Sequence, residues 1–340
     1  MNKSSQIKTN PYPYSSDNKR YQTMSWYLKN RYGEKCAKIP LNAGFTCPNR
    51  DGKVSFGGCT FCSAKGSGDS ILSFEKPLKN QYQDNLDRIH HKWPKAKGIP
   101  YFQSFSNTYA PLEKLKEIYT PFLEDPEIFC ICIATRADCL EEDFVSWISK
   151  YKKDIWIELG LQSSNDQTGK RINRGYSTKD VENALFLLKK YGVFSCIHLI
   201  NSLPFEDHEM MMESARWCTV FKPDAIKIHM LHMITNTQIA KDYLNGDFKL
   251  MDQDEYCTLV CDQLEILPPE MIIERITGDG LQEDLIAPLW TTKKTSVANQ
   301  VDRILFERNS WQGKYCKVDV AQEIPNNPDP SIQIGFKSKI

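Results

Sequence analysis

The stretch from Gly44 to Cys62, GFTCPNRDGKVSFGGCTFC, contains three cysteines from which the fold and the chemistry of this chain can be argued. Cys47, Cys59 and Cys62 are separated by gaps of eleven and two residues. A closed structural metal site has four protein ligands, whereas a reactive site keeps one position open. Three thiolates on a [4Fe–4S] cluster would leave one iron free to bind a small molecule. Because the apolar segment 39–41 comes just before it, we expect the stretch on the loop after a first strand, where α/β barrels carry their chemistry.

A zinc site is the alternative interpretation of these cysteines. Cys36 would supply a fourth thiolate, and C-x2-C pairs are common in zinc sites. The stretch also contains Gly44, Gly52, Gly57 and Gly58. These glycines let backbone N–H groups approach the sulfurs of a bulky inorganic core, which favours the iron–sulfur cluster. The cysteine spacing alone leaves both kinds of site open.

The composition favours one barrel domain with extensions in a reducing compartment. The chain has 340 residues, of which 41% are apolar and 25% charged, enough for a core of that size. It has no run of about 18 uninterrupted apolar residues, so we expect no membrane span. The first ten residues lack the apolar core of a signal peptide. Twelve cysteines in so long a chain do not resemble a secreted disulfide framework, and we expect a cytoplasmic protein.

Short β-branched runs alternate with helix-like stretches through most of the chain, which argues for βα units and a parallel sheet. We therefore predict an α/β fold, a partial (β/α)6 barrel with an N-terminal arm and a C-terminal extension. The predicted strands are residues 38–41, 99–104, 128–135, 155–161, 194–200 and 225–231. The predicted helices are residues 75–93, 112–123, 141–151, 178–191, 206–221 and 252–267. The predicted parts are the arm at 1–30, the barrel at 31–245, the extension at 246–320, with a strand at 271–276 and a helix at 295–309, and a loose tail at 321–340.

Polar residues recur at every second position in three of the predicted strands, so they share one face of the sheet. If the apolar positions between them face the helices, these polar side chains point into the barrel. Burying them there is costly unless they bind something, so we expect a ligand cavity rather than isolated core residues. The residues are Glu158, Gln162, His198, Lys227 and His229.

The pattern FTCPNRDG…GGCTFC resembles the cluster loop of the radical S-adenosylmethionine (SAM) enzymes, in an Elongator-like bacterial subgroup with a C-x11-C-x2-C spacing. The resemblance implies a [4Fe–4S] cluster on Cys47, Cys59 and Cys62, whose fourth iron chelates the amino and carboxylate groups of SAM. It also implies a flavodoxin- or ferredoxin-type electron donor. SAM would break to methionine and a 5′-deoxyadenosyl radical, which abstracts hydrogen from the substrate.

The resemblance also implies the residues around SAM. Gln162 and Arg174 match a glutamine and an arginine that related enzymes place on SAM, and an arginine suits the methionine carboxylate because its planar fork pairs bidentately. The usual Gly-Gly-Glu after the second strand is QSFSNT at 103–108, and the usual GLPGE loop is SLPFE at 202–206. Backbone carbonyls after the second strand can still accept from the ammonium of SAM, and Ser104 or Asn107 could add side-chain oxygens. The loss of both glycines at 202–206 puts only the packing of that loop on SAM in doubt. The full set of expected SAM contacts is Gln103, Ser104, Asn107, Thr135, Glu158, Gln162, Arg174 and His198.

The expected substrate is tRNA. Residues 1–40 contain eight basic against two acidic residues, and residues 286–317 contain six against two. Two basic flanks suggest a polyanion held at the periphery. With the Elongator-like resemblance, this favours remodelling of the C5 substituent of the wobble uridine, such as trimming carboxymethylaminomethyl to aminomethyl. The groups expected to hold the substrate carboxylate are Lys227, His229 and Arg275.

Two alternatives remain at this point. The enzyme could act on a small metabolite or a peptide instead of tRNA. The chain could also be a zinc-dependent nucleic-acid-binding protein without catalysis, in which Cys36 completes the metal site.

Overall fold

The protein folds around one curled sheet of seven parallel strands. The computed structural model describes residues 10–15, 18–64, 66, 76–278 and 283–317, so the first nine residues and the expected tail at 321–340 lie outside the described residues. The strand order is β1(Cys36–Leu41), β2(Lys97–Phe102), β3(Cys130–Thr135), β4(Asp154–Gln162), β5(Phe194–Asn201), β6(Ala225–Met230) and β8(Ile272–Arg275). Every neighbouring pair in it is parallel. The predicted α/β half-barrel is therefore confirmed, with one difference: the strand expected in the C-terminal extension is the seventh strand of the same sheet.

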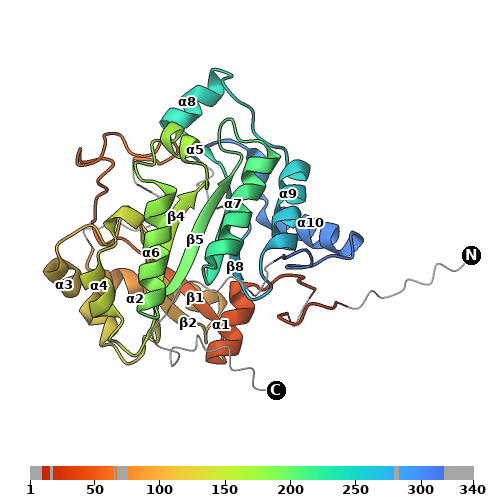
Figure 1. The fold of residues 1–340 in the computed structure, drawn as a ribbon. Helices are drawn as coiled ribbons and strands as arrows, with labels where there is room; N and C mark the ends of the chain where they lie inside the picture. The colour runs from red at the N-terminus through yellow and green to blue at the C-terminus, as the bar shows by residue number, and fades with distance from the viewer. Residues whose placement is uncertain (1–9, 16–17, 65, 67–75, 279–282, 318–340) are drawn as a thin grey trace, which may run out of the picture.

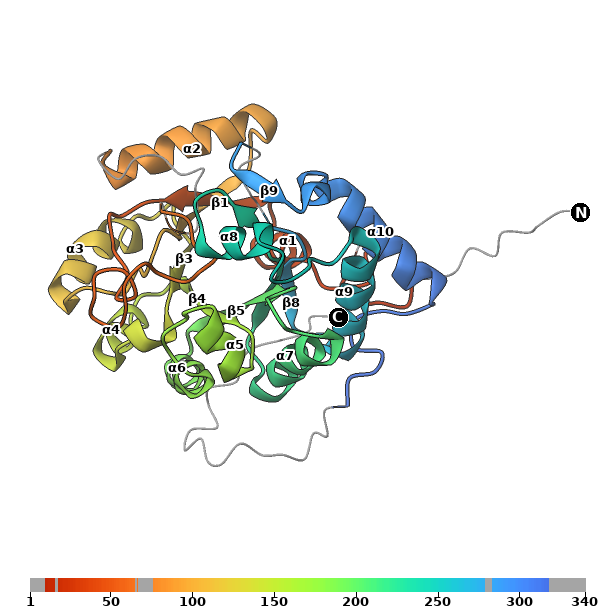
Figure 2. The ribbon, with the colours of Figure 1, turned by 90° about the horizontal axis from the view of Figure 1, so that it is seen from above.

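Helices follow the strands and cover the outer face of the sheet, as Figures 1 and 2 show. In α6, Val181, Ala184, Leu185 and Leu188 are buried at the spacing of one helical face, and a capping box at Ser177 begins the helix. The covering helices are α2(Leu78–Lys92), α3(Leu112–Leu123), α4(Glu142–Ile148), α6(Thr178–Lys190), α7(His208–Phe221), α9(Gln253–Ile266) and α10(Lys294–Glu307). The shorter elements are α5(Asp166–Arg171), α8(Gln238–Leu244), the turns η1(Ala137–Cys139) and η2(Leu289–Thr292), and the antiparallel pair β7(Met233–Ile234) and β9(Leu285–Ala287).

The amino-terminal end of the half-barrel is filled by a helix that the sequence analysis did not predict. The last part of the expected arm forms α1(Met24–Tyr32), which begins at the N-cap Thr23. Tyr27 and Leu28 are buried in one cluster with Trp156 of the inner face, and the rings of Tyr27 and Trp156 lie 6.0 Å apart. Further upstream, the Tyr12 hydroxyl donates to the Pro269 carbonyl at 2.7 Å. This end of the barrel is packed, so the carboxyl-terminal end is where a ligand can enter.

The two edges of the sheet are joined by an ion pair across its concave face. The Lys38 ammonium of β1 lies 2.6 Å from Glu274 Oε1 of β8. Since β1 and β8 are the first and last strands in the order, this contact spans the mouth of the half-barrel. The curl of the sheet therefore brings residues far apart in sequence onto one enclosed surface.

None of the helices in the described ranges is both long and apolar enough to cross a membrane.

Candidate active site

The loop after β1 places its three cysteines at the carboxyl-terminal end of the sheet. Gly58 has a φ of +81°, and a Cβ there would lie 2.8 Å from Arg50 Nε, so only glycine lets the loop close on that side chain. The Arg50 guanidinium donates to the Cys62 carbonyl at 3.1 Å. The Cys62 amide in turn donates to the Cys59 carbonyl at 3.0 Å. The arginine at the centre of the loop thus fixes the backbone that carries Cys59 and Cys62.

The sulfur atoms have nitrogen donors beside them. Asn49 Nδ2 lies 3.7 Å from Cys59 Sγ, and Arg136 Nη1 lies 3.9 Å from Cys47 Sγ. Burial raises the pKa of Cys59 to about 12, and the neighbouring Cys62 thiol adds to that shift, while Arg136 opposes it. A coordinated metal reverses such a shift, because a coordinating thiol is deprotonated. All three thiols are partly exposed and outside disulfides.

Three cysteines outside disulfides on one loop fit a [4Fe–4S] cluster in number and kind, since each thiolate binds its own iron and the nearby N–H groups favour the thiolate form. No three His, Cys, Asp or Glu side chains converge as around a single metal ion among the residues that the structure describes.

Cys36 does not belong to this site. It is the first residue of β1, whereas the cysteine loop leaves β1 after Leu41. Five residue steps along a strand amount to roughly 16 Å. Cys36 therefore lies at the opposite end of the strand, beside Glu34 and Lys97. The expectation of a four-cysteine zinc site completed by Cys36 is wrong.

A network of paired charges occupies the concave face of the sheet. Glu158 accepts from the Tyr101 hydroxyl at 2.7 Å and also from the ammonium groups of Lys38 and Lys227. Glu274 lies 2.8 Å from the Lys227 ammonium. The two lysines and two carboxylates balance in charge. They hold the pKa of the Glu158 carboxyl well below its usual range although its burial acts to raise it.

Two histidines lie next to this network, and a third, His232, lies near the second of them. His198 Nε2 lies 2.9 Å from Glu158 Oε2, and the rings of His198 and His229 are 5.5 Å apart. The Nε2 atoms of His229 and His232 are buried and have no partner among the described residues. Burial lowers the pKa of His229, with His198 and Arg275 adding to the shift. It lowers the pKa of His232 to about 4, with Lys294 and Arg275 adding to it. Both rings are therefore neutral near pH 7.

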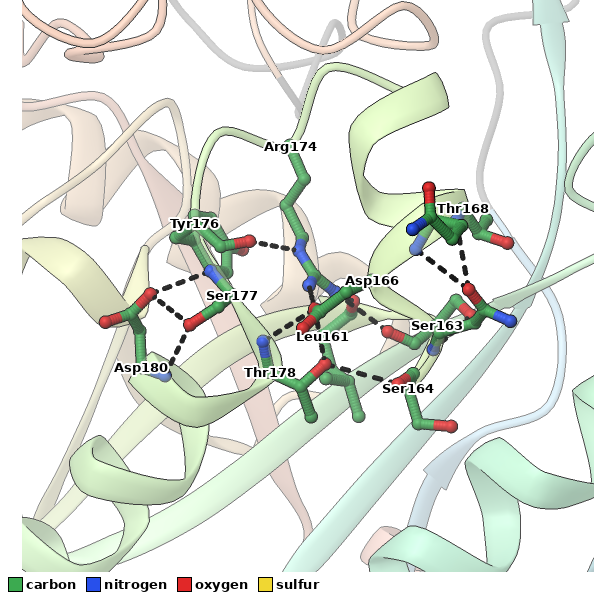
Figure 3. A network of polar contacts seen from close by, with 12 residues as sticks. Leu161, Ser163, Ser164, Asp166, Thr168, Arg174, Tyr176, Ser177, Thr178 and Asp180 are labelled. Carbon is green, nitrogen blue, oxygen red and sulfur yellow. Dashed lines mark hydrogen bonds and ion pairs between the residues drawn. The ribbon is translucent and has the colours of Figure 1, made fainter.

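Arg174 lies at the centre of the connection between β4 and α6 (Figure 3). Its guanidinium is buried and donates to the carbonyls of Leu161 at 2.6 Å, Ser163 at 2.8 Å and Tyr176 at 2.9 Å. It also pairs with Asp166 at 2.7 Å. The arginine expected to contact SAM thus holds the protein's own backbone, and its contact with SAM remains a prediction.

Gln162 ends β4 in a strained conformation. Its φ is +59°, and the register shifts at this point of the strand. A Cβ on Gly160 would lie 2.2 Å from Gln162 Nε2, so the glycine makes room for this amide. Gln162 Oε1 is buried and has no partner in the described part of the chain. Such strain gathers at functional sites, and it leaves a carbonyl acceptor unused at the end of the strand.

The expected contacts after β2 and β3 brace the loops of this face. Asn107 Nδ2 donates to the carbonyls of Ser104 at 3.0 Å and Ala134 at 2.9 Å. The hydroxyls of Thr108 and Thr135 lie 2.7 Å apart. Asn107 Oδ1 is a buried acceptor with no partner among the described residues. Gln103 directly follows β2 and is half-buried.

The structure thus separates the expected site residues into two groups. Glu158, His198 and Lys227 share one network on the concave face, with His229 against it. The cysteine loop meets Arg136, which donates to the Arg174 carbonyl at 2.9 Å. The sequence analysis missed several residues of these two groups. One of them, Lys38, could have been found from the period-two pattern of β1, in which Lys38 alternates with the buried Ile39 and Leu41. The missed members are Lys38, Asn49, Tyr101, His232 and Glu274, whereas Arg136 was expected to meet the ribose or the substrate.

Four basic residues in the described part of the N-terminal flank are engaged within the protein. Lys19 pairs with Asp302, Arg31 with Asp154, and Lys38 belongs to the buried network. Arg20 is buried. The flank also adjoins α1, at the end of the sheet opposite the cysteine loop (Figure 1). These four contacts leave Lys29 and Lys35 exposed, so a polyanion held by this flank remains a prediction, and Lys293 and Lys294 of the second flank are exposed as well.

Comparisons with known proteins cover both the site and the C-terminal part. The family model of the Radical SAM superfamily matches residues 46–218, and that of the Radical SAM C-terminal domain matches residues 223–307. The uncharacterized protein YtqA of Bacillus subtilis (strain 168) is 44% identical over 311 residues, 91% of this chain and 97% of that protein. Protein YhcC of Escherichia coli (strain K12) is 31% identical over 283 residues, 82% and 90% of the two chains.

Two further similarities cover less of the other protein. The tRNA uridine(34) acetyltransferase of Methanocaldococcus infernus is 29% identical over 152 residues, 44% of this chain and 28% of that protein. The structure of the archaeal Methanocaldococcus infernus Elp3, with an N-terminal deletion, superposes with a TM-score of 0.61 at 17% identity. That superposition covers 82% of this chain and 64% of the other, and it supports the half-barrel fold.

The neutral state of His232 predicts a dependence of stability on pH. A histidine with a lowered pKa stabilises the folded state above its unfolded pKa of about 6.5, and this contribution is lost as the pH falls toward about 4. Between pH 6.5 and 5 the loss from His232 alone should be about 1.5 kcal/mol. We expect the H232Q variant to lose less stability over this interval than the unsubstituted protein by that amount.

The measurement is equilibrium urea unfolding under anaerobic conditions at several pH values. The exposed His91 of α2 provides the control, and H91Q should follow the unsubstituted protein. Parallel pH profiles for H232Q and the unsubstituted protein would show that His232 is not buried as a neutral ring.

Proposed function

The chain belongs to the radical SAM superfamily, and on that premise we propose that it is a tRNA-modifying enzyme acting on the C5 substituent of the wobble uridine. Enzymes of this family use a [4Fe–4S] cluster and SAM. When bound, these groups supply one electron that breaks a carbon–sulfur bond of SAM and gives an organic radical able to abstract hydrogen. The observation that carries the proposal of a reactive site is the loop with three cysteines outside disulfides at the open end of the half-barrel.

In this proposal Cys47, Cys59 and Cys62 hold the cluster, and Arg136 and Asn49 favour the thiolate forms through their N–H groups. The buried acceptors Gln162 Oε1 and Asn107 Oδ1 support a nearby contact with the hydrogen-bond donors of SAM, because a buried acceptor without a partner is costly. Arg174 positions the end of β4 from within.

The substrate carboxylate belongs, in this proposal, near His229 and Arg275. The Lys227 ammonium, also expected there, is engaged by Glu158 and Glu274, so its part is to keep the concave face charge-balanced. The neutral imidazoles of His229 and His232 have buried ring nitrogens that can each donate or accept one hydrogen bond. They support a polar substrate group at the carboxyl-terminal ends of β6 and β8.

The assignment of tRNA rests on similarity to the tRNA uridine(34) acetyltransferase and on the fold shared with Elp3. The exposed Lys293 and Lys294 add cationic groups. We further propose a cytoplasmic location and a flavodoxin- or ferredoxin-type electron donor. All twelve cysteines are outside disulfides, which fits a reducing compartment.

The first test concerns the cluster. Anaerobically prepared protein should contain about four iron and four sulfide per chain. Cys47→Ala, Cys59→Ala and Cys62→Ala should each abolish the cluster, because each removes one iron ligand. Cys36→Ala is the matched control and should retain the iron, since that residue lies at the other end of β1. One tightly bound zinc without sulfide would contradict the proposal.

The second test concerns the substrate. Deleting the gene should make one wobble uridine of cellular tRNA keep a longer C5 substituent, such as carboxymethylaminomethyl in place of aminomethyl. Nucleoside mass spectrometry of purified tRNA measures this. Complementation with the unsubstituted gene should restore the nucleoside, and complementation with Cys62→Ala should not. An unaltered wobble-nucleoside profile in the deletion strain would favour a small metabolite or peptide as the substrate.

A further inference from the structure

A surface cavity beside the cysteine loop has the features of a pocket for one nucleobase. Its volume is about 280 Å³, and its walls include Thr60, Arg171, Phe205 and Asp242. Thr60 lies between Cys59 and Cys62, and its amide donates to the Ile172 carbonyl at 3.0 Å. Its carbonyl accepts from the Ile239 amide at 3.1 Å. The cavity is therefore tied by backbone hydrogen bonds to the loop that carries the thiols.

Phe205 is held at the edge of this cavity in a conformation that its packing does not explain. Its side chain is 64% exposed, and its φ is +66°, in the left-handed region that phenylalanine rarely adopts. The Arg171 guanidinium lies over the ring, 5.1 Å from its centroid. An exposed aromatic ring paired with a guanidinium is a surface on which an unstacked base can lie, because both groups stack on bases.

The rest of the rim fits a nucleotide. Asp242 and Asp247 line the cavity, and a carboxylate accepts from the exocyclic amino group of a base. Lys170, Lys241 and Lys249 are exposed and adjacent in sequence to Arg171, Asp242 and Phe248 of the cavity wall. Those cations suit the phosphates on either side of a bound base. Figure 1 places α5 and α8, which carry several of these residues, at the same end of the sheet as the cysteine loop.

We propose that the cavity between Arg171, Phe205 and Asp242 binds a single unpaired base of the RNA substrate next to the modified nucleotide. This inference rests on the proposed function, because it assigns a recognition site to the same RNA. The cavity, of about 280 Å³, is large enough for one base, and the helices α5 and α8 that line it lie at the open end of the barrel. A base bound there would fix the position of the RNA loop relative to the thiols.

The test measures anaerobic binding of a tRNA transcript with uridine at position 34 by fluorescence anisotropy. Phe205→Gly and Phe205→Ala should weaken binding roughly 5- to 150-fold, the usual effect of removing a stacking ring. Phe205→Gly is the more telling variant, since glycine adopts the backbone conformation at this position without strain. Phe205→Trp should bind within about threefold of the unsubstituted protein, because it keeps a stacking surface.

The matched control is Phe186→Ala, which removes a 44%-exposed phenylalanine from α6 and should leave RNA affinity unchanged. Iron content of every variant checks that the cluster loop is intact. Transcripts with single abasic sites in the anticodon loop provide the decisive comparison. Removing one particular base should weaken binding to the unsubstituted protein and have no further effect on binding to Phe205→Gly.

The possible results distinguish failure of the base pocket from failure of the proposed tRNA-modifying function. If the unsubstituted protein binds tRNA and the Phe205 variants bind equally well, the pocket does not hold a base and this inference is overturned alone. The same holds if abasic sites weaken both proteins equally. If the unsubstituted protein does not bind tRNA at low salt, the proposed function fails, and this inference fails with it.

Discussion

The concave face of the sheet depends on a balanced set of buried charges. Lys38 and Lys227 share Glu158 and Glu274, and they come from four different strands of the seven. Removing one member would leave an unpaired charge inside the protein, at a cost of roughly 3–5 kcal/mol. The pair between Lys38 and Glu274 also joins the two edges of the sheet. An intact pair therefore links the two edges across the concave face, and losing one partner would destabilise the fold.

This constraint explains how the functional groups are arranged. The packed helix α1 closes the amino-terminal end, and the charge network fills the middle of the concave face. Only the carboxyl-terminal end is left, where the cysteine loop, the strained Gln162 and the two buried imidazoles lie. Parallel strands make this convergence unavoidable, because all their carboxyl ends meet at one edge of the sheet.

Most strands and helices and the cysteine loop could be predicted from the sequence, because their signals are local in the chain. Strands and helices with clear periodicity, such as α3 and β4, were found close to their observed limits, and the cysteine spacing indicated the family. The pairing of Lys38 with Glu274 could not be found, because it depends on a curl that joins residues 236 positions apart. The ion pairs of Lys19 and Arg31 could not be predicted for a similar reason, since local charge counts do not reveal which cations have partners. His232 lies just beyond the end of β6, so the period-two pattern of that strand could not predict its burial.

We propose that a radical generated at the cysteine loop abstracts hydrogen from tRNA. The most direct test uses tRNA that carries deuterium in the C5 substituent of its wobble uridine. The reduced holoenzyme is incubated with this tRNA and SAM, and the 5′-deoxyadenosine that forms is analysed by mass spectrometry. If the radical abstracts this deuterium, it should pass from the tRNA into 5′-deoxyadenosine. Formation of 5′-deoxyadenosine without deuterium, with the labelled nucleoside unchanged, would contradict this proposal.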